Sequence, residues 1–292
     1  MNLYLTKTHF SPVFNRYVLP GPDLSMVFET VEKFAPGNCF GADGSQWDAH
    51  FPLAIAEIIA TFRAQFTDKD RVHRYYSQMY NGYTNVGGNI VNIIGNPSGH
   101  YNTSTDNSLA HMVLIALCGY EIKIPFVDLD QYIKYYCCGD DLLYSTTHPA
   151  FEPESLFELY KKFGVYLEFE DYAPRHADKL TFVGMVPCWR TLCGQRRLLY
   201  HMRLDKARAS SRAQLKGRTP IDILAKLCSI AQLVFADKEA FELYSRLHAD
   251  VLAQFVANKQ LSGLEPDVLG QLRSLQPGVL TTAYTEWESS SL

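Results

Sequence analysis

The stretch that most constrains the fold of this chain is residues 133–146, which read IKYYCCGDDLLYST. Gly139 tolerates a positive φ and an aspartate bonds readily to nearby backbone, so Gly139 and Asp140 favour a tight turn. The apolar and aromatic runs on either side predict two strands, and therefore a β-hairpin. Its bend would hold the adjacent carboxylates of Asp140 and Asp141, oxygen ligands suited to Mg²⁺. Taken alone, the tripeptide also fits an ordinary solvated turn.

A second pair of carboxylates lies upstream, in the run D-G-S-Q-W-D. Asp43 ends a short strand predicted at residues 39–42, and Asp48 follows five residues later on an expected loop at 44–48. A carboxylate at a strand end is well placed to meet the bend of a neighbouring hairpin. The alternative is an aspartate that only caps or shapes a turn.

The third informative stretch is S-G-H-Y-N-T-S-T-D-N at residues 98–107. Thr103 and Asn107 are four residues apart, so both project from one face near the start of a predicted helix. The free amides and positive partial charge of that end would suit the anionic part of a nucleotide. Asn107 offers a donor and an acceptor, which reading a sugar hydroxyl requires. Alternatively, Thr103 and Asp106 form a capping box.

The remaining pattern predicts a mixed chain with a substantial core. The sequence has 292 residues and is 47% hydrophobic, which argues against a disordered chain. Its net charge of −4 argues against a generally basic nucleic-acid binder. No apolar run is long enough to span a membrane, so no transmembrane segment is expected. Helices are expected at 23–35, from 52 onward, in the first part of 67–94, and at 103–118, 153–164 and 221–255. Short strands are expected at 39–42, 165–169 and 180–183.

The three stretches together resemble the RNA-dependent RNA polymerases of positive-strand RNA viruses. DGSQWD is similar to motif A, GNPSGHYNTSTDN to motif B and CGDDLL to motif C. The set is picornavirus-like, and the details of motif B resemble the astrovirus and potyvirus branch. Residues 161–167 are similar to the start of motif D, and residues 180–185 to motif E. The resemblance covers about residues 25–200.

The resemblance implies an α+β fold: a polymerase palm, with an antiparallel sheet backed by helices in the right-hand architecture, and a C-terminal helical thumb. Residues 1–38 would be a remnant of the fingers leading into the palm. The palm would span 39–189, with a fingers-like insertion at about 67–94, and the thumb 190–292. Only 42 residues precede Asp43, whereas family members carry several hundred, so a palm–thumb fragment is expected.

The resemblance also implies two Mg²⁺ ions, with Mn²⁺ as an alternative, that activate a primer 3′-hydroxyl and stabilise the departing pyrophosphate. Asp43 and Asp140 would be the principal metal ligands, and Asp141 a supporting one. A motif D lysine would protonate the pyrophosphate. The candidates for this general acid are Lys179, Lys161 and Lys162.

The nucleotide site is implied by the same comparison. Asp48 and Asn107 would check the ribose 2′-hydroxyl, the group that separates RNA from DNA precursors. Ser98 and Thr103 would hold that network, and the loop at Ser98 and Gly99 would flex during translocation.

A local basic stretch adds an electrostatic argument. Residues 190–218 contain nine Lys and Arg residues and one acid, Asp205. Such a stretch could follow the phosphates of a product duplex, although a solvated basic face is the alternative.

The sequence thus predicts template-directed RNA synthesis in viral genome replication. The expected partners are RNA template and product, ribonucleoside triphosphates and other viral replication proteins, in a membrane-associated complex of the host cytoplasm. A reverse transcriptase-like polymerase is the nearest alternative, although Asn107 and the Gly-Asp-Asp turn argue against it. A catalytically inactive RNA-binding palm module is the other alternative.

Overall fold

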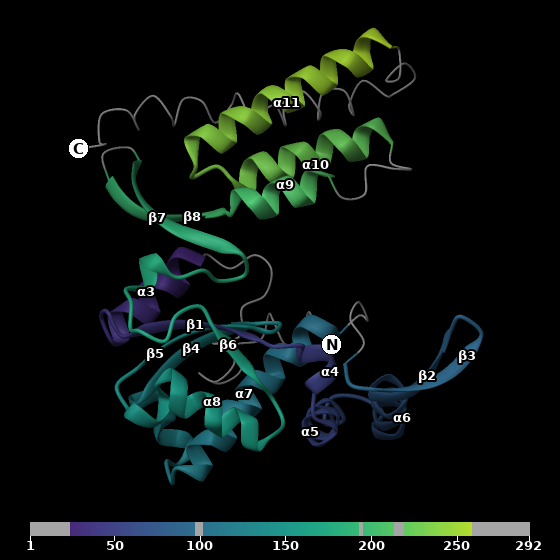
Figure 1. Ribbon diagram of the computed structural model, residues 1–292, viewed down its shortest axis with the longest axis vertical. Helices are drawn as coiled ribbons and strands as arrows, with labels where there is room; N and C mark the ends of the chain where they lie inside the picture. The colour runs from purple at the N-terminus through teal and green to yellow at the C-terminus, as the bar shows by residue number, and fades with distance from the viewer. Residues whose placement is uncertain (1–23, 97–101, 193–194, 213–218, 259–292) are drawn as a thin grey trace. The chain divides into compact units, whose positions relative to one another are not determined.

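The computed structural model describes residues 24–96, 102–192, 195–212 and 219–258. The chain divides into two compact units, Met1–Val183 and Gly184–Leu292, whose elements are labelled in Figure 1.

The first unit is built on a four-stranded sheet in the order β4-β5-β1-β6. Its strands are β4 (Ile133–Cys138), β5 (Asp141–Thr146), β1 (Cys39–Gly44) and β6 (Leu167–Phe169). Every neighbouring pair is antiparallel. The predicted hairpin at 133–146 is confirmed, with Gly139 at φ 68° in its bend. The α+β prediction is confirmed as well.

Helices cover both faces of this sheet. Figure 1 shows α3 (Leu24–Phe34) on one side and α7 (Thr103–Glu121) and α8 (Pro153–Lys162) on the other. A sheet covered on both faces buries nearly all its side chains, and five of the six β5 residues are buried. The layer between sheet and helices contains large, fully buried side chains, including Tyr135, Tyr144, Tyr160, Leu114 and Phe151.

The segment between β1 and α7 forms α4 (Trp47–His50), α5 (Leu53–Arg63), α6 (Lys69–Tyr80) and the hairpin β2 (Asn81–Val86) and β3 (Asn89–Ile94). The predicted helix followed by an extended segment in 67–94 is confirmed. The hairpin is largely exposed, with Tyr83 and Ile90 more than three-quarters accessible.

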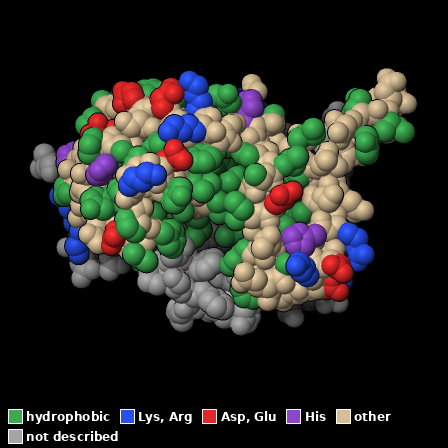
Figure 2. All heavy atoms as spheres, turned by 90° about the horizontal axis from the view of Figure 1, so that it is seen from below, with side chains coloured by type: hydrophobic (Ala, Val, Ile, Leu, Met, Phe, Trp, Pro, Cys, Tyr) green, Lys and Arg blue, Asp and Glu red, His purple; other side chains and the backbone are tan. Residues whose placement is uncertain are grey.

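An apolar hollow of about 510 Å³ lies between α5, α7 and the 3₁₀ helix η1 (Phe126–Gln131). Ile58, Tyr120 and Phe126 contribute to its rim and are exposed. Figure 2 shows hydrophobic side chains gathered in the middle of the face seen from below.

The second unit begins with a hairpin of β7 (Met185–Leu192) and β8 (Gln195–Met202). The described part of this unit continues with three helices: α9 (Leu204–Arg212), α10 (Pro220–Leu233) and α11 (Lys238–Ala257). Its core consists of small and apolar residues of these helices: Ala207, Leu227, Ile230, Ala231, Val234, Ala240, Phe241 and Tyr244. The predicted helical segment at 221–255 is present as two helices. No described helix is both long enough and apolar enough to cross a bilayer.

Two local predictions are wrong. The strand expected at 180–183 is absent: Leu180 follows η3 (Ala177–Lys179), and the strand begins only at Met185. Val183 and Gly184 both adopt positive φ, at 54° and 69°, which turns the chain before β7. The expected loop at 44–48 is interrupted by α4, because Trp47 is buried and starts a helical turn.

Candidate active site

The sheet brings the three predicted catalytic aspartates together. Asp43 at the end of β1 is the register partner of Asp141 at the start of β5. The backbone N–H of Gly44 donates to the carbonyl oxygen of Asp140 over 3.2 Å, which ties the hairpin bend to β1. Asp43 is exposed, and Asp140 and Asp141 are half-buried. Three carboxylates therefore project from one end of the sheet.

The hairpin bend rests on α7 through backbone contacts. The Gly139 N–H donates to Ser108 Oγ over 2.8 Å, and the Ser108 hydroxyl donates to the Ser104 carbonyl over 2.9 Å. The thiol of Cys137 donates to the Ser108 carbonyl over 3.3 Å. These bonds fix the bend on the helix that also carries Thr103 and Asn107.

The buried side chain of His111 on α7 also supports the hairpin bend, a role that no sequence pattern indicated. Its Nε2 lies 2.9 Å from the Asp140 carbonyl oxygen and its Nδ1 lies 3.3 Å from the Tyr160 hydroxyl. Burial lowers the pKa of His111 to about 4, against the opposing effect of its bond to Asp140. The ring is therefore neutral near pH 7; because a carbonyl only accepts, Nε2 carries the proton and Nδ1 accepts from Tyr160. The ring also stacks on Trp47, with centroids 4.4 Å apart.

A second polar network joins the two predicted ribose-reading residues through Asn96. The Asn96 amide donates to Asn107 Oδ1 over 2.5 Å and to Asp48 Oδ1 over 3.3 Å. Asn96 and Asn107 are both buried. Sequence reasoning missed Asn96, although it stands two residues before Ser98 in the motif B stretch. Asp48 and Asn107 are thus brought into one network.

The electrostatics of this network are linked to the hairpin bend at Asp140. Burial raises the pKa of the Asp48 carboxyl, and the negative charge of Asp140 raises it further, while the bond from Asn96 opposes both. The effect of Asp140 on Asp48 indicates that the network predicted to read the ribose lies near a predicted metal ligand.

The remaining motif B predictions have different outcomes. Thr103 is the first residue of α7 and is half-buried. Ser98 and Gly99 lie outside the described residues, so their roles stay predictions. The capping-box alternative for Thr103 and Asp106 is wrong, because the helix is capped at Asn102 and the Asp106 carboxylate is fully buried on α7.

Asp106 instead forms a buried ion pair with Arg63. Arg63 donates to Asp106 Oδ1 from Nε over 2.9 Å and from a terminal nitrogen over 2.5 Å. The hydroxyls of Tyr76 and Tyr80 donate to Oδ2 over 2.7 and 3.1 Å. Burial, followed by the charge of Asp106, raises the pKa of both tyrosines. This network fixes α7 to α5 and α6.

The carboxylates fit the chemistry of a divalent metal without forming a completed cage. Asp43, Asp140 and Asp141 offer only oxygen ligands, which Mg²⁺ prefers. Within the described ranges, no three His, Cys, Asp or Glu side chains are already grouped so that they could hold an ion. The donor type therefore fits, and the metal role of these residues stays a prediction.

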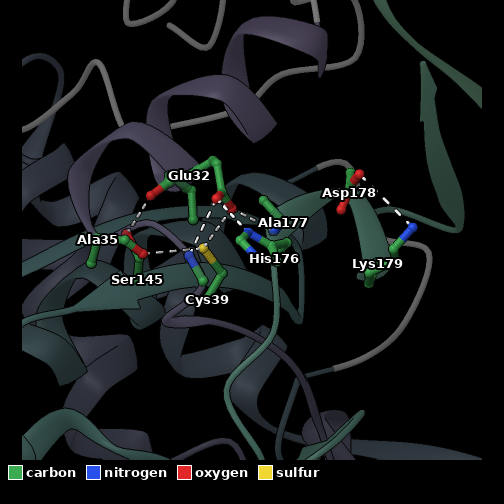
Figure 3. A network of polar contacts seen from close by, with 10 residues as sticks. Glu32, Ala35, Cys39, Ser145, His176, Ala177, Asp178 and Lys179 are labelled. Atoms are coloured by element: carbon green, nitrogen blue, oxygen red, sulfur yellow. Dashed lines mark hydrogen bonds and ion pairs between the residues drawn. The ribbon is translucent and has the colours of Figure 1, made fainter. Parts of the chain in front are cut away.

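The general-acid candidates all lie on exposed surface. Lys179 is 3.9 Å from Asp178, Lys161 is 3.2 Å from Glu158, and Lys162 is 3.2 Å from Glu121. Figure 3 shows Lys179 on η3 beside a network centred on Glu32. Glu32 accepts from the Ala177 N–H over 2.8 Å and is 2.7 Å from His176 Nδ1. The assignment of Lys179 stays a prediction.

An antiparallel sheet with Asp43 paired to Asp141, packed on a helix carrying Asn107, defines the palm of a nucleic-acid polymerase. Residues 19–225 match the profile of the family described as viral RNA-dependent RNA polymerase. The chain belongs to that family, and the resemblance seen in its motifs is confirmed.

The chain is also similar to parts of viral genome polyproteins. The genome polyprotein of Ornithogalum mosaic virus is 30% identical over 157 residues, 51% of this chain and 14% of that protein. That of Blackberry virus Y (isolate Blackberry plant/USA:Arkansas/C3ARK/2005) is 28% identical over 228 residues, 72% of this chain and 6% of that protein. The chain thus spans a small part of these curated relatives.

The fold matches a solved polymerase. The Sicinivirus 3Dpol RNA dependent RNA polymerase superposes with a TM-score of 0.63 at 15% sequence identity. The match covers 89% of this chain and 58% of that one. The predicted palm architecture is confirmed by this likeness.

Proposed function

We propose that the polypeptide carrying this chain copies an RNA template into RNA during viral genome replication. The observation that carries the proposal is the pairing of Asp43 with Asp141, with Asp140 tied to the same strand through Gly44. Family membership supports the choice of RNA as template and product. The substrates are ribonucleoside triphosphates.

Asp43, Asp140 and Asp141 would hold two divalent ions, Mg²⁺ or Mn²⁺. When bound, such ions lower the pKa of the attacking hydroxyl and neutralise the charge of the departing pyrophosphate. The protein's own contribution is positioning: the hairpin bend is fixed by Gly44, Ser108 and His111, so the carboxylates need not reorganise during the reaction.

The nucleotide would be recognised beside this bend. Asp48 and Asn107, joined through Asn96, present the acceptor and donor that a ribose 2′-hydroxyl requires. Thr103 at the start of α7 and Ser98 would help to hold that network, and the loop at Ser98 and Gly99 would flex during translocation. Lys179 would supply the proton to the pyrophosphate.

The basic stretch would bind the RNA product. Arg196 on β8 lies over the ring of Trp189, 4.8 Å from its centroid, and Lys206, Arg208 and Arg212 are exposed on α9. Because Ala207 faces the buried core of the second unit, the charged side chains of α9 point outward. Replacing the three α9 bases with alanine should weaken RNA binding and reduce its dependence on salt.

We also infer that the polymerase works with other viral replication proteins in a membrane-associated complex of the host cytoplasm. The polyprotein origin of the relatives supports co-expression with such partners. Co-purification of the tagged polymerase with host membranes and viral proteins from infected cells would test this.

Primer extension on an RNA template by the full native polypeptide tests the central proposal. Asp140→Asn should reduce Mg²⁺-dependent extension about a thousand-fold or more, because several kcal/mol of transition-state stabilisation depend on the metal ligands. Asp250→Asn, on the exposed surface of α11, is the matched control. Activity that survives Asp140→Asn would contradict the metal assignment. A preference for deoxynucleotides would favour a reverse transcriptase. RNA binding without primer extension would favour a catalytically inactive RNA-binding module.

A further inference from the structure

Backbone contacts with Asp48 fix the position of Asn96, in addition to the contacts of its side chain. Its N–H donates to the Asp48 carbonyl over 2.8 Å, and the preceding Gly95 lies so close that a Cβ there would be 2.2 Å from the same carbonyl oxygen. Asn96 is 2% exposed. A buried amide held in this way has little freedom to turn.

The chemistry of its neighbours fixes the orientation of the Asn96 amide. An ionised carboxylate can only accept, so the group that faces Asp48 Oδ1 at 3.3 Å must be the NH₂ of Asn96. The same NH₂ lies 2.5 Å from the Asn107 side chain, which must therefore present its oxygen. Neither amide can be flipped without placing two donors or two acceptors against each other.

We propose that Asn96 is a positioning residue that sets the specificity of this polymerase for ribose. By binding Asn107 Oδ1, it directs the Asn107 NH₂ toward the nucleotide as a donor. By binding Asp48 Oδ1, it holds the carboxylate as the facing acceptor. The inference rests on the proposed function, since it names how the same site distinguishes ribonucleotides from deoxyribonucleotides.

The resulting pair is complementary to one hydroxyl group. A ribose 2′-hydroxyl donates its proton to Asp48 and accepts from the Asn107 NH₂. A deoxyribose has no 2′-hydroxyl, so neither Asp48 nor the Asn107 NH₂ forms a hydrogen bond with the nucleotide. A site that binds a substrate hydroxyl in this way rejects the analogue that lacks it. Without Asn96, the Asn107 amide can rotate and present its oxygen, so the discrimination falls.

The experiment compares kcat/KM for ATP and 2′-deoxy-ATP in the full polypeptide and in Asn96→Leu, which removes both donors at similar volume. We expect the ATP-to-dATP ratio to fall about tenfold or more, mainly through a loss with ATP. Asn92→Leu, on the exposed strand β3, is the matched control and should keep the ratio. A loss by the same factor with both nucleotides would show a merely structural role and overturn the inference.

Two further measurements keep the outcome decisive. If Asn96→Leu does not fold, Asn96→Asp, which keeps the shape and exchanges donors for an acceptor, should lower the same ratio.

Equilibrium binding of ATP and dATP separates this inference from the proposed function. If the wild-type protein makes no RNA yet prefers ATP, and Asn96→Leu loses that preference, the proposed function fails and the inference stands. Equal affinities of the wild-type protein for ATP and dATP would overturn the inference.

Discussion

The Nε2 atom of His111 lies 2.9 Å from the carbonyl oxygen of Asp140 and is a buried donor to the hairpin bend. Asp140 also accepts from the Gly44 N–H, so the conformation of one peptide group depends on two different elements, α7 and β1. The position of the Asp140 carboxylate is thereby coupled to the fully buried side chain of His111.

Replacing His111 with leucine should therefore destabilise the protein and slow synthesis. We expect the free energy of unfolding in urea to fall by roughly 1–3 kcal/mol, the cost of leaving a buried polar group without its partner. The rate of primer extension at saturating nucleotide should fall as well. Tyr160→Phe, which removes only the bond to Nδ1, should have a smaller effect on both. A His111→Leu protein as stable as the wild type would contradict the assigned role.

Gly95 should be intolerant of any side chain. Alanine there would place Cβ 2.2 Å from the Asp48 carbonyl and would hold a φ of 131° that L residues avoid. Gly88→Ala is the matched control, because Gly88 also has a positive φ, at 93°, and a Cβ added there would meet no atom within 4 Å. We expect Gly95→Ala to lower the free energy of unfolding by roughly 1–3 kcal/mol more than the control does. If Gly95→Ala and Gly88→Ala lost equal free energies of unfolding in urea, the contact between the added Cβ and Asp48 would be easily relieved.

The sequence predicted those features that depend on local pattern. The hairpin at 133–146 follows from two apolar runs around a glycine turn. The strand expected at 39–42 is present as β1 (Cys39–Gly44), which runs through Asp43 and ends one residue after it. Their pairing was expected because a strand end and a hairpin bend can share one edge of a sheet. The register of Asp43 with Asp141 became visible only in the structure.

The features that sequence could not supply depend on distant side chains. Asn96 meets Asn107 because a tight approach at Gly95 folds the chain back onto Asp48, and no periodicity encodes this. Val183 adopts a positive φ that is rare for a β-branched residue, so a continuous strand was the natural expectation. Asp106 fitted a capping box by spacing alone, yet its carboxylate pairs with Arg63, 43 positions away.

The Arg63–Asp106 pair should be the most costly polar contact to break in the first unit's described part. Both side chains are at most 1% exposed, so Arg63→Met leaves a buried carboxylate that keeps the hydrogen bonds from Tyr76 and Tyr80 but loses the charge of Arg63. We expect a loss of about 3–5 kcal/mol in the free energy of unfolding, measured in urea.

The double variant Arg63→Met with Asp106→Leu provides the control. Because it removes both charges, its loss should be smaller than the sum of the two single losses. Strict additivity in this double-mutant cycle would show that the two side chains are not coupled.

The contact between Glu32 and His176 should make stability depend on pH (Figure 3). The hydrogen bond from His176 to Glu32, together with the charge of Glu32, raises the pKa of His176. Burial would raise the pKa of Glu32, but the bonds from Ala177, His176 and Cys39 lower it overall. The stabilisation from His176 is complete below its unfolded pKa, about 6.5, and is lost as pH rises through the folded value. The stabilisation from Glu32 is present above the unfolded pKa of 4.5 and is lost as pH falls through the lowered pKa of Glu32 in the folded protein.

The pair should therefore stabilise the fold most between about pH 4.5 and 6.5. We expect His176→Gln to lower the thermal unfolding midpoint at pH 5.5 and to lower it less at pH 8.5, because the charge of the wild-type imidazole is lost as pH rises through its raised pKa. His73→Gln on α6 is the control for changing one histidine to an amide, and its effect should not follow this trend. If the loss in unfolding midpoint caused by His176→Gln grew toward high pH, its pH dependence would be opposite to the one that the raised pKa of His176 requires. In that case the contact would act as a neutral hydrogen bond instead of an ion pair.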